Sequence, residues 1–179
     1  MKLPIAYYGD PVLRKKCIPI QKIDDELRQF VTDMKETMFA YNGVGLAAPQ
    51  VHRTVAVFIT CEPVEGADGK YSQGEPKVYI NPRLFNPSVE TCIMEDGCLS
   101  VPKFYPFIER PYSIDVEAMD LDGKIFVESL VGYGARIVMH ENDHLNGVLS
   151  FDRLPPQEKK KAAPILREIQ KKYYHPAKK

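Results

Sequence analysis

The chain has 179 residues, of which 44% are hydrophobic and 27% charged, and this composition is typical of one soluble globular domain. No apolar run approaches the roughly 18 residues that span a bilayer, and the first residues, MKLPIAYYGDP, lack the apolar core of a signal peptide. We therefore expect a cytoplasmic protein with no membrane partner. Its four cysteines, at positions 17, 61, 92 and 98, form no CxxC pair and suggest no disulfide framework.

The first half of the chain predicts one helix and two strands. Residues 24–38 place five apolar side chains on one helical face: Leu27, Phe30, Val31, Met34 and Met38. Residues 55–60 and 77–81 have the apolar and β-branched character of strands. The segment between them, residues 61–76, is rich in turn residues, and we expect an exposed loop there.

The second half predicts a hairpin followed by a helix. Residues 112–120 alternate in polarity, Asp122 and Gly123 supply a turn, and IFVESLV (125–131) returns as the second strand. Residues 132–145 then read as a helix that Asn146 and Gly147 end. Because strands and helices do not alternate strictly, we predict an α+β fold, with antiparallel sheets packed around a central helix that carries two histidines.

The C-terminal segment differs from the rest of the chain in charge. From Pro155 onward there are eight lysines and arginines and two acids, so residues 155–179 carry a net charge of +6 and residues 1–154 carry −6. We divide the chain there into a single domain and a basic tail. Pro164 suits the first turn of a tail helix with a shared apolar face: Ile165, Leu166, Ile169 and Tyr173. A basic arm that meets nucleic acid and a half-ordered solvated tail are both open interpretations.

The strongest chemical signal is His140, Glu141 and His144, an H-E-x-x-H pattern on the predicted helix. Residues four apart share a helical face, so the two imidazoles can converge on one cation. Glu141 lies beside them and can reach a water molecule at the cation without being a ligand. The alternative is two capped or core histidines next to a surface glutamate.

A catalytic metal site needs a third protein ligand, and the sequence offers several. A metzincin would need histidine at position 150, which is Ser150. Cys98, in MEDGCLSVP, is the better candidate because a thiolate and two imidazoles suit a soft or borderline metal, although spacing alone does not decide it. The remaining candidates have no supporting motif: His52, Glu158, Glu168 and His175.

Three segments together resemble the peptide deformylases, which remove the formyl group from newly made bacterial proteins. GVGLAAPQ (43–50) matches the family's G-φ-G-φ-A-A-x-Q at every position, DGCLS (96–100) is similar to E-G-C-L-S, and HENDH (140–144) fits H-E-x-D-H. Their order and separation agree with the family from about residue 10 to residue 154. Two positions depart from the usual pattern, with Asp96 in place of glutamate and Met139 in place of glutamine, and neither is a ligand position.

The resemblance implies a metal-dependent hydrolase that releases formate from N-formylmethionine, with residues 1–154 as the catalytic domain. Cys98, His140 and His144 would hold one divalent ion, with water in the fourth position. Fe²⁺ is the native ion that the family implies, and Zn²⁺, Ni²⁺ or Co²⁺ also suit these ligands. Asp143 would orient part of the site.

The same resemblance assigns the reacting groups. Glu141 would accept a proton from water and deliver it to the departing amine. Gln50 and the backbone N–H of Leu99 would donate hydrogen bonds to the formyl oxygen. The loop from Gly43 to Gly45 lets the main chain approach the substrate, although a plain tight turn is the alternative.

The substrate would be a nascent formylated polypeptide. Ile137 and the loop at Gly45 are candidate walls of the methionine pocket, although core packing would also explain Ile137. The basic tail could dock on ribosomal RNA through phosphate contacts, and nothing indicates DNA binding. Two other functions stay open at this point, an H-E-x-x-H peptidase that cuts internal bonds and a non-catalytic zinc or ribosome-binding module.

Overall fold

The computed structural model describes residues 1–176. Its helices are α1 (Asp25–Ala40), α2 (Gly132–Leu145) and α3 (Pro156–Tyr173), and its short 3-10 turns are η1 (Pro11–Arg14), η2 (Ala48–Val51) and η3 (Ser150–Arg153). Its strands are β1 (Gly45–Ala47), β2 (Val57–Thr60), β3 (Pro63–Glu65), β4 (Tyr71–Gln73), β5 (Lys77–Phe85), β6 (Thr91–Glu95), β7 (Phe107–Pro111), β8 (Ser113–Met119) and β9 (Ile125–Val131). No helix within these residues is long and apolar enough to cross a membrane.

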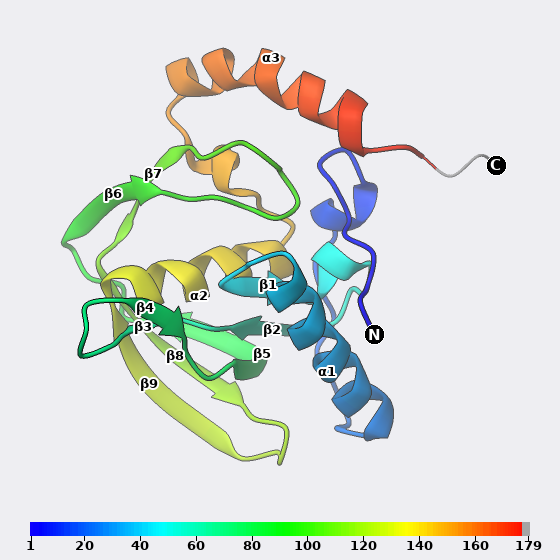
Figure 1. Cartoon of the computed structure of the whole chain (residues 1–179), viewed down its shortest axis with the longest axis vertical. Helices are drawn as coiled ribbons and strands as arrows, with labels where there is room; N and C mark the ends of the chain where they lie inside the picture. Colours follow the sequence, from blue (N-terminus) through cyan, green and yellow to red (C-terminus); the bar gives the residue numbers. More distant parts are fainter. Residues whose placement is uncertain (177–179) are drawn as a thin grey trace.

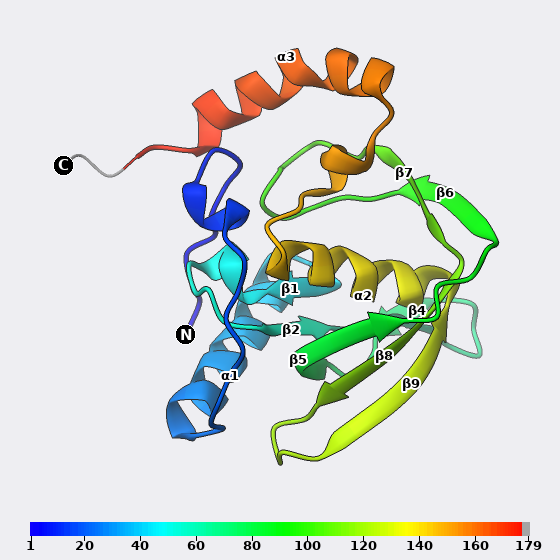
Figure 2. The same ribbon diagram turned by 180° about the vertical axis from the view of Figure 1, so that it is seen from behind.

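The main sheet has five antiparallel strands in the order β1-β2-β5-β8-β9, and two further antiparallel pairs are β3–β4 and β6–β7. Helix α2 contacts β1, β2, β8 and β9 on one face of this sheet, and the β6–β7 pair lies on the other side of α2 (Figures 1 and 2). The predicted α+β class with antiparallel sheets is therefore confirmed. Figure 1 also shows α3 beyond the β6–β7 pair and α1 beside β1.

Helix α1 forms as its sequence predicts. Asp24 caps its N-terminus by accepting a hydrogen bond from the Leu27 N–H at 3.0 Å. The five apolar residues of the predicted face are all buried, and they pack against Leu46, Ile59 and Ile80 of the sheet. The strands predicted at 55–60 and 77–81 correspond to β2 and to the first part of the longer β5.

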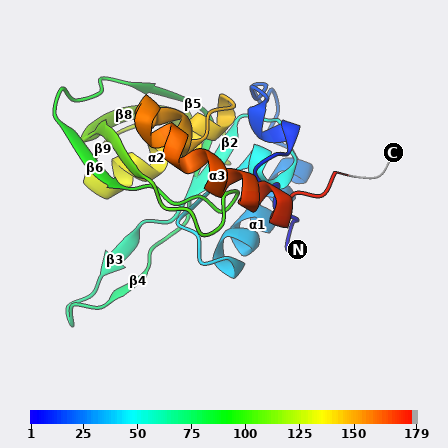
Figure 3. The same cartoon turned by 90° about the horizontal axis from the view of Figure 1, so that it is seen from above.

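Residues 61–76 are not a plain loop, because they contain the β3–β4 hairpin. Pro63 pairs with Gln73 and Glu65 with Tyr71, and Gly69 takes a φ of 74° near the tip. Viewed from above, this hairpin projects away from the body of the molecule (Figure 3). Short exposed strands carry little apolar alternation, and the same reason explains why the sequence did not predict β6 and β7.

The predicted hairpin and helix that follow are confirmed. Strands β8 and β9 pair from Ser113 and Val131 to Met119 and Ile125. Helix α2 has the predicted bounds, and Gly147, with a φ of 71°, ends it by donating its N–H to the His144 carbonyl at 3.2 Å.

The predicted start of the tail helix is wrong. Helix α3 begins at Pro156, so Pro164 lies inside it and Pro156 takes the first-turn position. Its buried side chains, Ala162, Leu166 and Ile169, join a cluster that includes Leu13, Leu149 and Phe151, whereas Ile165 is 49% exposed and does not share their face. The division of the chain at residue 154 stays a prediction.

Candidate active site

Three side chains that could hold a metal ion converge at helix α2, which carries two of them. Cys98, His140 and His144 each offer one ligand atom, and these atoms all lie within 4.8 Å of one another. The Cys98 Sγ and the His140 Nε2 each lie 3.2 Å from the His144 Nε2. Ligands on one tetrahedral cation, with bonds of about 2.0–2.3 Å, would be roughly 3.3–3.6 Å apart, so the donor set fits such an ion.

Asp96 orients His140. The Nδ1 of His140 shares a hydrogen bond with the Asp96 carboxylate, which leaves Nε2 facing the other two ligand atoms. The second oxygen of Asp96 accepts hydrogen bonds from Arg110 at 2.6 Å and from Arg136 at 3.3 Å. All four side chains are buried. Asp96 thus makes a supporting hydrogen bond to a candidate ligand, although its side chain is shorter than glutamate.

Burial and the charges of this network shift the pKa values of Asp96, His140 and His144. Burial opposes ionisation of Asp96, but its hydrogen bond to His140 and the charges of His140 and Arg110 outweigh burial and lower its pKa. Burial also opposes charge on His140, yet the hydrogen bond to Asp96 raises its pKa. Burial and the neighbouring His140 lower the pKa of His144. A metal ligand must be unprotonated at its donor atom, so metal binding at such a site is coupled to proton release.

Asp143 belongs to the same network. Its carboxylate accepts hydrogen bonds from Arg110 at 2.8 Å and from the Arg153 Nε at 2.6 Å. Arg110 therefore joins Asp143 to Asp96. Asp143 is thus linked to His140 by hydrogen bonds through two side chains, Arg110 and Asp96. Met139 lies elsewhere, in a buried apolar cluster with Ile114 and Ala135. The thioether is therefore buried in apolar packing rather than aimed at the three ligand atoms.

Glu141 is a buried carboxylate beside the three donors. It is 4% exposed, and its Oε2 has no hydrogen-bond partner among residues 1–176. Burial raises the pKa of Glu141 to about 7, against the opposing effect of His140. A carboxylate with such a pKa can take up and return a proton near neutral pH.

The glycines of the segment 43–50 allow a close approach of the main chain. A Cβ at Gly45 would collide with the Glu141 carboxylate, and one at Gly43 would lie 3.0 Å from a methyl carbon of Leu99. Gln50 is 1% exposed rather than a surface amide. Its Oε1 accepts the Ala47 N–H at 2.8 Å, and its Nε2 lies 3.5 Å from the Cys98 Sγ.

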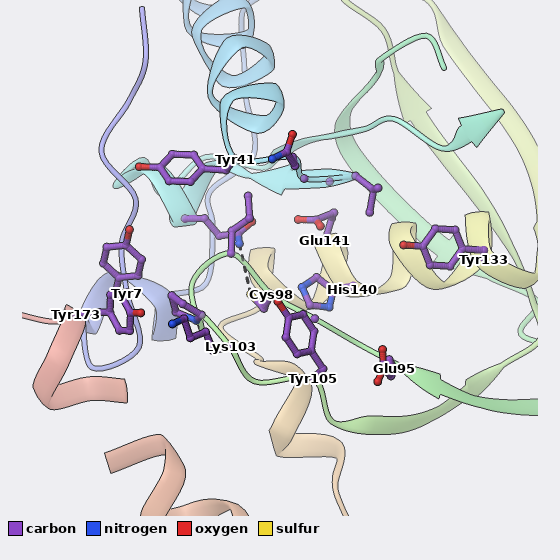
Figure 4. Close-up of a pocket in the computed structure, with 18 residues that line it drawn as sticks. Tyr7, Tyr41, Glu95, Cys98, Lys103, Tyr105, Tyr133, His140, Glu141 and Tyr173 are labelled. Carbon is purple, nitrogen blue, oxygen red and sulfur yellow. Dashed lines mark hydrogen bonds between the residues drawn. The ribbon is translucent and has the colours of Figure 1, made fainter. Parts of the chain in front are cut away.

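A pocket of about 680 Å³ opens over these groups (Figure 4). Most of the site residues proposed from the sequence line it: Gly43, Gly45, Gln50, Cys98, Leu99, His140 and Glu141. His144 lies beneath, 1% exposed. Ile137 lines an adjoining pocket of about 50 Å³ together with Val44, Tyr133 and Arg136.

The alternative ligands are excluded by position. His52 pairs with Asp10, and Glu158 and Glu168 pair with lysines on the exposed face of α3. His175 is exposed after the end of α3.

Sequence reasoning missed the arginines of the network and most of the pocket wall. Arg110 and Arg136 resemble surface residues in a sequence, because nothing local marks a buried charge. Five tyrosines line the pocket, and none stood in a motif: Tyr7, Tyr41, Tyr105, Tyr133 and Tyr173.

Comparison with known families decides what this site belongs to. The model of the polypeptide deformylase family matches residues 2–160. The chain belongs to the peptide deformylase family. A peptide deformylase of Pseudothermotoga lettingae is 39% identical over 174 residues, which cover 95% of each chain.

Solved structures of peptide deformylases have the same fold. A plant peptide deformylase matches with a TM-score of 0.86 and 36% identity, over 96% of this chain and 90% of that one. A peptide deformylase of Acinetobacter baumannii, crystallised with Met-Ala-Ser bound, matches with a TM-score of 0.79 and 34% identity, over 86% and 99%. The protein is accordingly a hydrolase that removes the N-formyl group from newly synthesised polypeptides, and it uses a divalent metal ion.

Proposed function

We propose that this peptide deformylase holds its metal ion on Cys98, His140 and His144, with α2 as the central helix that carries the ion. The observation that carries the proposal is the convergence of one thiol and two imidazole nitrogens, with the His144 Nε2 3.2 Å from both the Cys98 Sγ and the His140 Nε2. Support also comes from Asp96, which holds His140 with Nε2 toward the site.

We take Fe²⁺ as the native ion, as the family resemblance implies, with Zn²⁺, Ni²⁺ and Co²⁺ as ions that the same ligands accept. When bound, a divalent ion supplies Lewis acidity that activates water at neutral pH. Activity and metal content after anaerobic loading with each ion test this assignment. Loss of activity in air from the Fe²⁺ form alone is the expected result, because Fe²⁺ is readily oxidised by oxygen whereas the thiolate is common to all four forms.

Glu141 acts as the proton carrier of the reaction. Its buried carboxylate takes a proton from the water that attacks the formyl carbon and returns it to the departing amine nitrogen, which leaves formate and a free N-terminus. A pKa near 7 suits both transfers. The space above Glu141 exists because residue 45 is glycine.

Gln50 and the backbone N–H of Leu99 stabilise the transition state. As the formyl carbon becomes tetrahedral, its oxygen gains negative charge and needs donors that are already in place. The Gln50 amide is held by its own bond to the Ala47 N–H, so its Nε2 stays aimed at the site. The methionine side chain of the substrate occupies the smaller pocket beside Ile137.

Formate release from formyl-Met-Ala-Ser by the Fe²⁺-loaded protein tests the chemistry. Glu141→Gln should lower kcat by about 10²–10⁴ while the metal content stays unchanged. Glu90→Gln is the matched control, because Glu90 is exposed and lies outside the pocket. Full activity of Glu141→Gln, or no formate from the metal-loaded parent, would overturn these roles.

Gln50→Leu tests the oxyanion donor separately. Removal of one such donor commonly lowers kcat by about 10²–10³. We expect that loss with little change in metal content, because Gln50 is not a ligand. An unchanged kcat would leave Leu99 as the donor and remove Gln50 from the mechanism.

We also propose that the protein works in the cytoplasm and that its basic C-terminal segment meets ribosomal RNA near emerging chains. Support comes from the lysines of α3, which lie on its exposed face. Truncation after Arg153 would remove the apolar contacts of α3, so charge reversal at Lys160 and Lys171 is the cleaner variant. Weaker co-sedimentation with ribosomes in low salt is expected, and unchanged sedimentation would overturn the proposal.

A further inference from the structure

The two ends of the active-site pocket differ in charge. In the view of Figure 4, Lys103 lies on the side of Tyr7 and Tyr173, whereas Glu95 and Tyr133 lie on the opposite side of His140. Lys103 is the one lysine or arginine among the described residues that line this pocket. The acids that line it are Glu95 and the buried Glu141, and no ion pair joins either of them to Lys103 within residues 1–176.

The backbone of Lys103 is in an unusual conformation. Its φ is 62°, in the left-handed region that asparagine and glycine adopt at lower cost than lysine. Residues held in this region are concentrated at ligand sites, where side-chain position matters more than local stability. Lys103 is also exposed, and no hydrogen bond or ion pair of its side chain is found in residues 1–176. Its ammonium group is thus presented at the pocket without a partner.

Hydrogen-bond donors surround the same end of the pocket. The centroids of the Tyr7 and Tyr173 rings lie 5.3 Å apart, and Tyr41 lines the same pocket. Burial raises the pKa of Tyr7, so its hydroxyl stays a neutral donor. A second cation is near, since the Lys2 Nζ lies 4.0 Å from the centre of the Tyr41 ring.

Helix α3 fixes this end. A Cβ on Gly9 would lie 2.8 Å from side-chain atoms of Gln170 and Tyr174, so the N-terminal segment packs tightly against the last turn of α3. Tyr173 from α3 and Phe104, next to Lys103, pack on the same apolar cluster. The cationic end of the pocket is therefore built from three separate parts of the chain.

We propose that Lys103 and the tyrosines around it form a subsite for the carboxylate of an aspartate or glutamate that follows formylmethionine in the substrate. The proposal rests on the proposed function, because it places the formyl group at Glu141 and the downstream chain along the pocket. It makes Lys103 a specificity-determining residue. The metal-binding and proton-transfer groups are separate from it.

The expected effect is modest and depends on salt. An ion pair with an exposed lysine changes an equilibrium by roughly two- to fivefold at low ionic strength. At 0.5 M salt the Debye length falls to a few ångströms, so the preference should largely disappear.

The test compares kcat/KM for seven amidated peptides with the metal-loaded enzyme: formyl-Met-Ala-Ala-Ala and its variants with one glutamate or one lysine at the second, third or fourth residue. The amidated C-terminus leaves the side-chain carboxylate as the peptide's sole negative charge. At one position glutamate should be preferred over alanine, and lysine at that position should be disfavoured. Deformylation of the all-alanine peptide establishes the proposed function independently of this preference.

Three variants test whether Lys103 causes the preference for glutamate. Lys103→Asn keeps a residue that tolerates the left-handed backbone, and it should abolish the glutamate preference while raising the melting temperature. Lys103→Glu should reverse the preference toward lysine. Lys124→Asn, at the exposed β8–β9 turn, is the matched control and should keep the parent ratio. Equal kcat/KM for glutamate and lysine peptides in the parent, or a preference that survives Lys103→Asn, would overturn the subsite.

Discussion

Helices α2 and α3 differ in whether they bury charged and polar side chains as well as apolar ones. Helix α2 buries charged and polar groups, among them Arg136, His140, Glu141 and His144, whereas α3 buries only apolar ones and keeps its lysines exposed. Three of the buried ionisable groups of α2, Arg136, His140 and Asp143, pair with Asp96 or Arg110 from other parts of the chain. Helix α3 needs no such partner, because its packing is non-directional.

The buried charges around α2 lower the stability of the fold unless they are paired, whereas the apolar packing of α3 raises it. Buried ion pairs seldom stabilise a protein more than apolar packing would, but loss of one partner leaves the other charge uncompensated. The network around α2 therefore fixes the position of His140, while the packing of α3 supplies ordinary stability and one wall of the pocket. Four predictions test this division.

The largest effect should follow from Arg110→Met. Arg110 is 2% exposed and neutralises both Asp96 and Asp143, so its removal leaves two buried carboxylates without their shared partner. We expect the free energy of unfolding to fall by roughly 3–5 kcal/mol in urea denaturation. Arg83→Met is the control, since the exposed Arg83–Glu117 pair should contribute less than about 1 kcal/mol. Equal losses in the two variants would contradict the division.

For α3, two neighbouring residues separate packing from exposure. Leu166→Ala should lower the free energy of unfolding by roughly 3 kcal/mol, because Leu166 is 6% exposed within an apolar cluster. Ile165→Ala, at 49% exposure, should change it by about 0.5 kcal/mol or less. If both variants lose equally, the face of α3 has been assigned wrongly.

The buried Glu141 carboxyl should make the stability of the metal-free protein depend on pH. Its pKa rises from 4.5 to about 7 on burial, so its contribution to stability is present below pH 4.5 and is lost as the pH rises through 7. Glutamine does not titrate, so metal-free Glu141→Gln should be more stable than the parent at pH 8, by up to roughly 3 kcal/mol. Urea midpoints at pH 5 and pH 8 measure this, and a pH-independent difference would contradict it.

The smallest effect concerns the orientation of His140. Asp96→Asn removes the charge that holds His140 while it keeps the side-chain volume, and metal affinity should fall by about 10–100-fold in chelator competition. Asp96→Glu keeps the charge and should lose less. If both variants bind metal as tightly as the parent, Asp96 does not position the ligand.

The two helices also differ in how well the sequence predicted them. The predicted bounds of α2 are correct because its apolar pattern ends at Asn146 and Gly147, and tertiary contacts did not override this local signal. The predicted start of α3 was wrong, because Pro156 and Pro164 offer the same first-turn signal and only packing decides between them. Ile165 and Leu166 are adjacent and equally apolar, and only the fold shows which of them is buried.

By itself the sequence determined the features that depend on near neighbours: the faces of α1 and α2, the β8–β9 hairpin and the two histidines one turn apart. Through its resemblance to a family it also named Cys98 as their partner. Only the tertiary structure decided which charges are buried. Asp96 meets Arg110 across 14 residues and His140 across 44, and in the sequence Arg110 looks like a surface residue. A buried ion pair forms only where groups distant in the sequence offset the cost of each other's desolvation, and a local pattern carries no record of that.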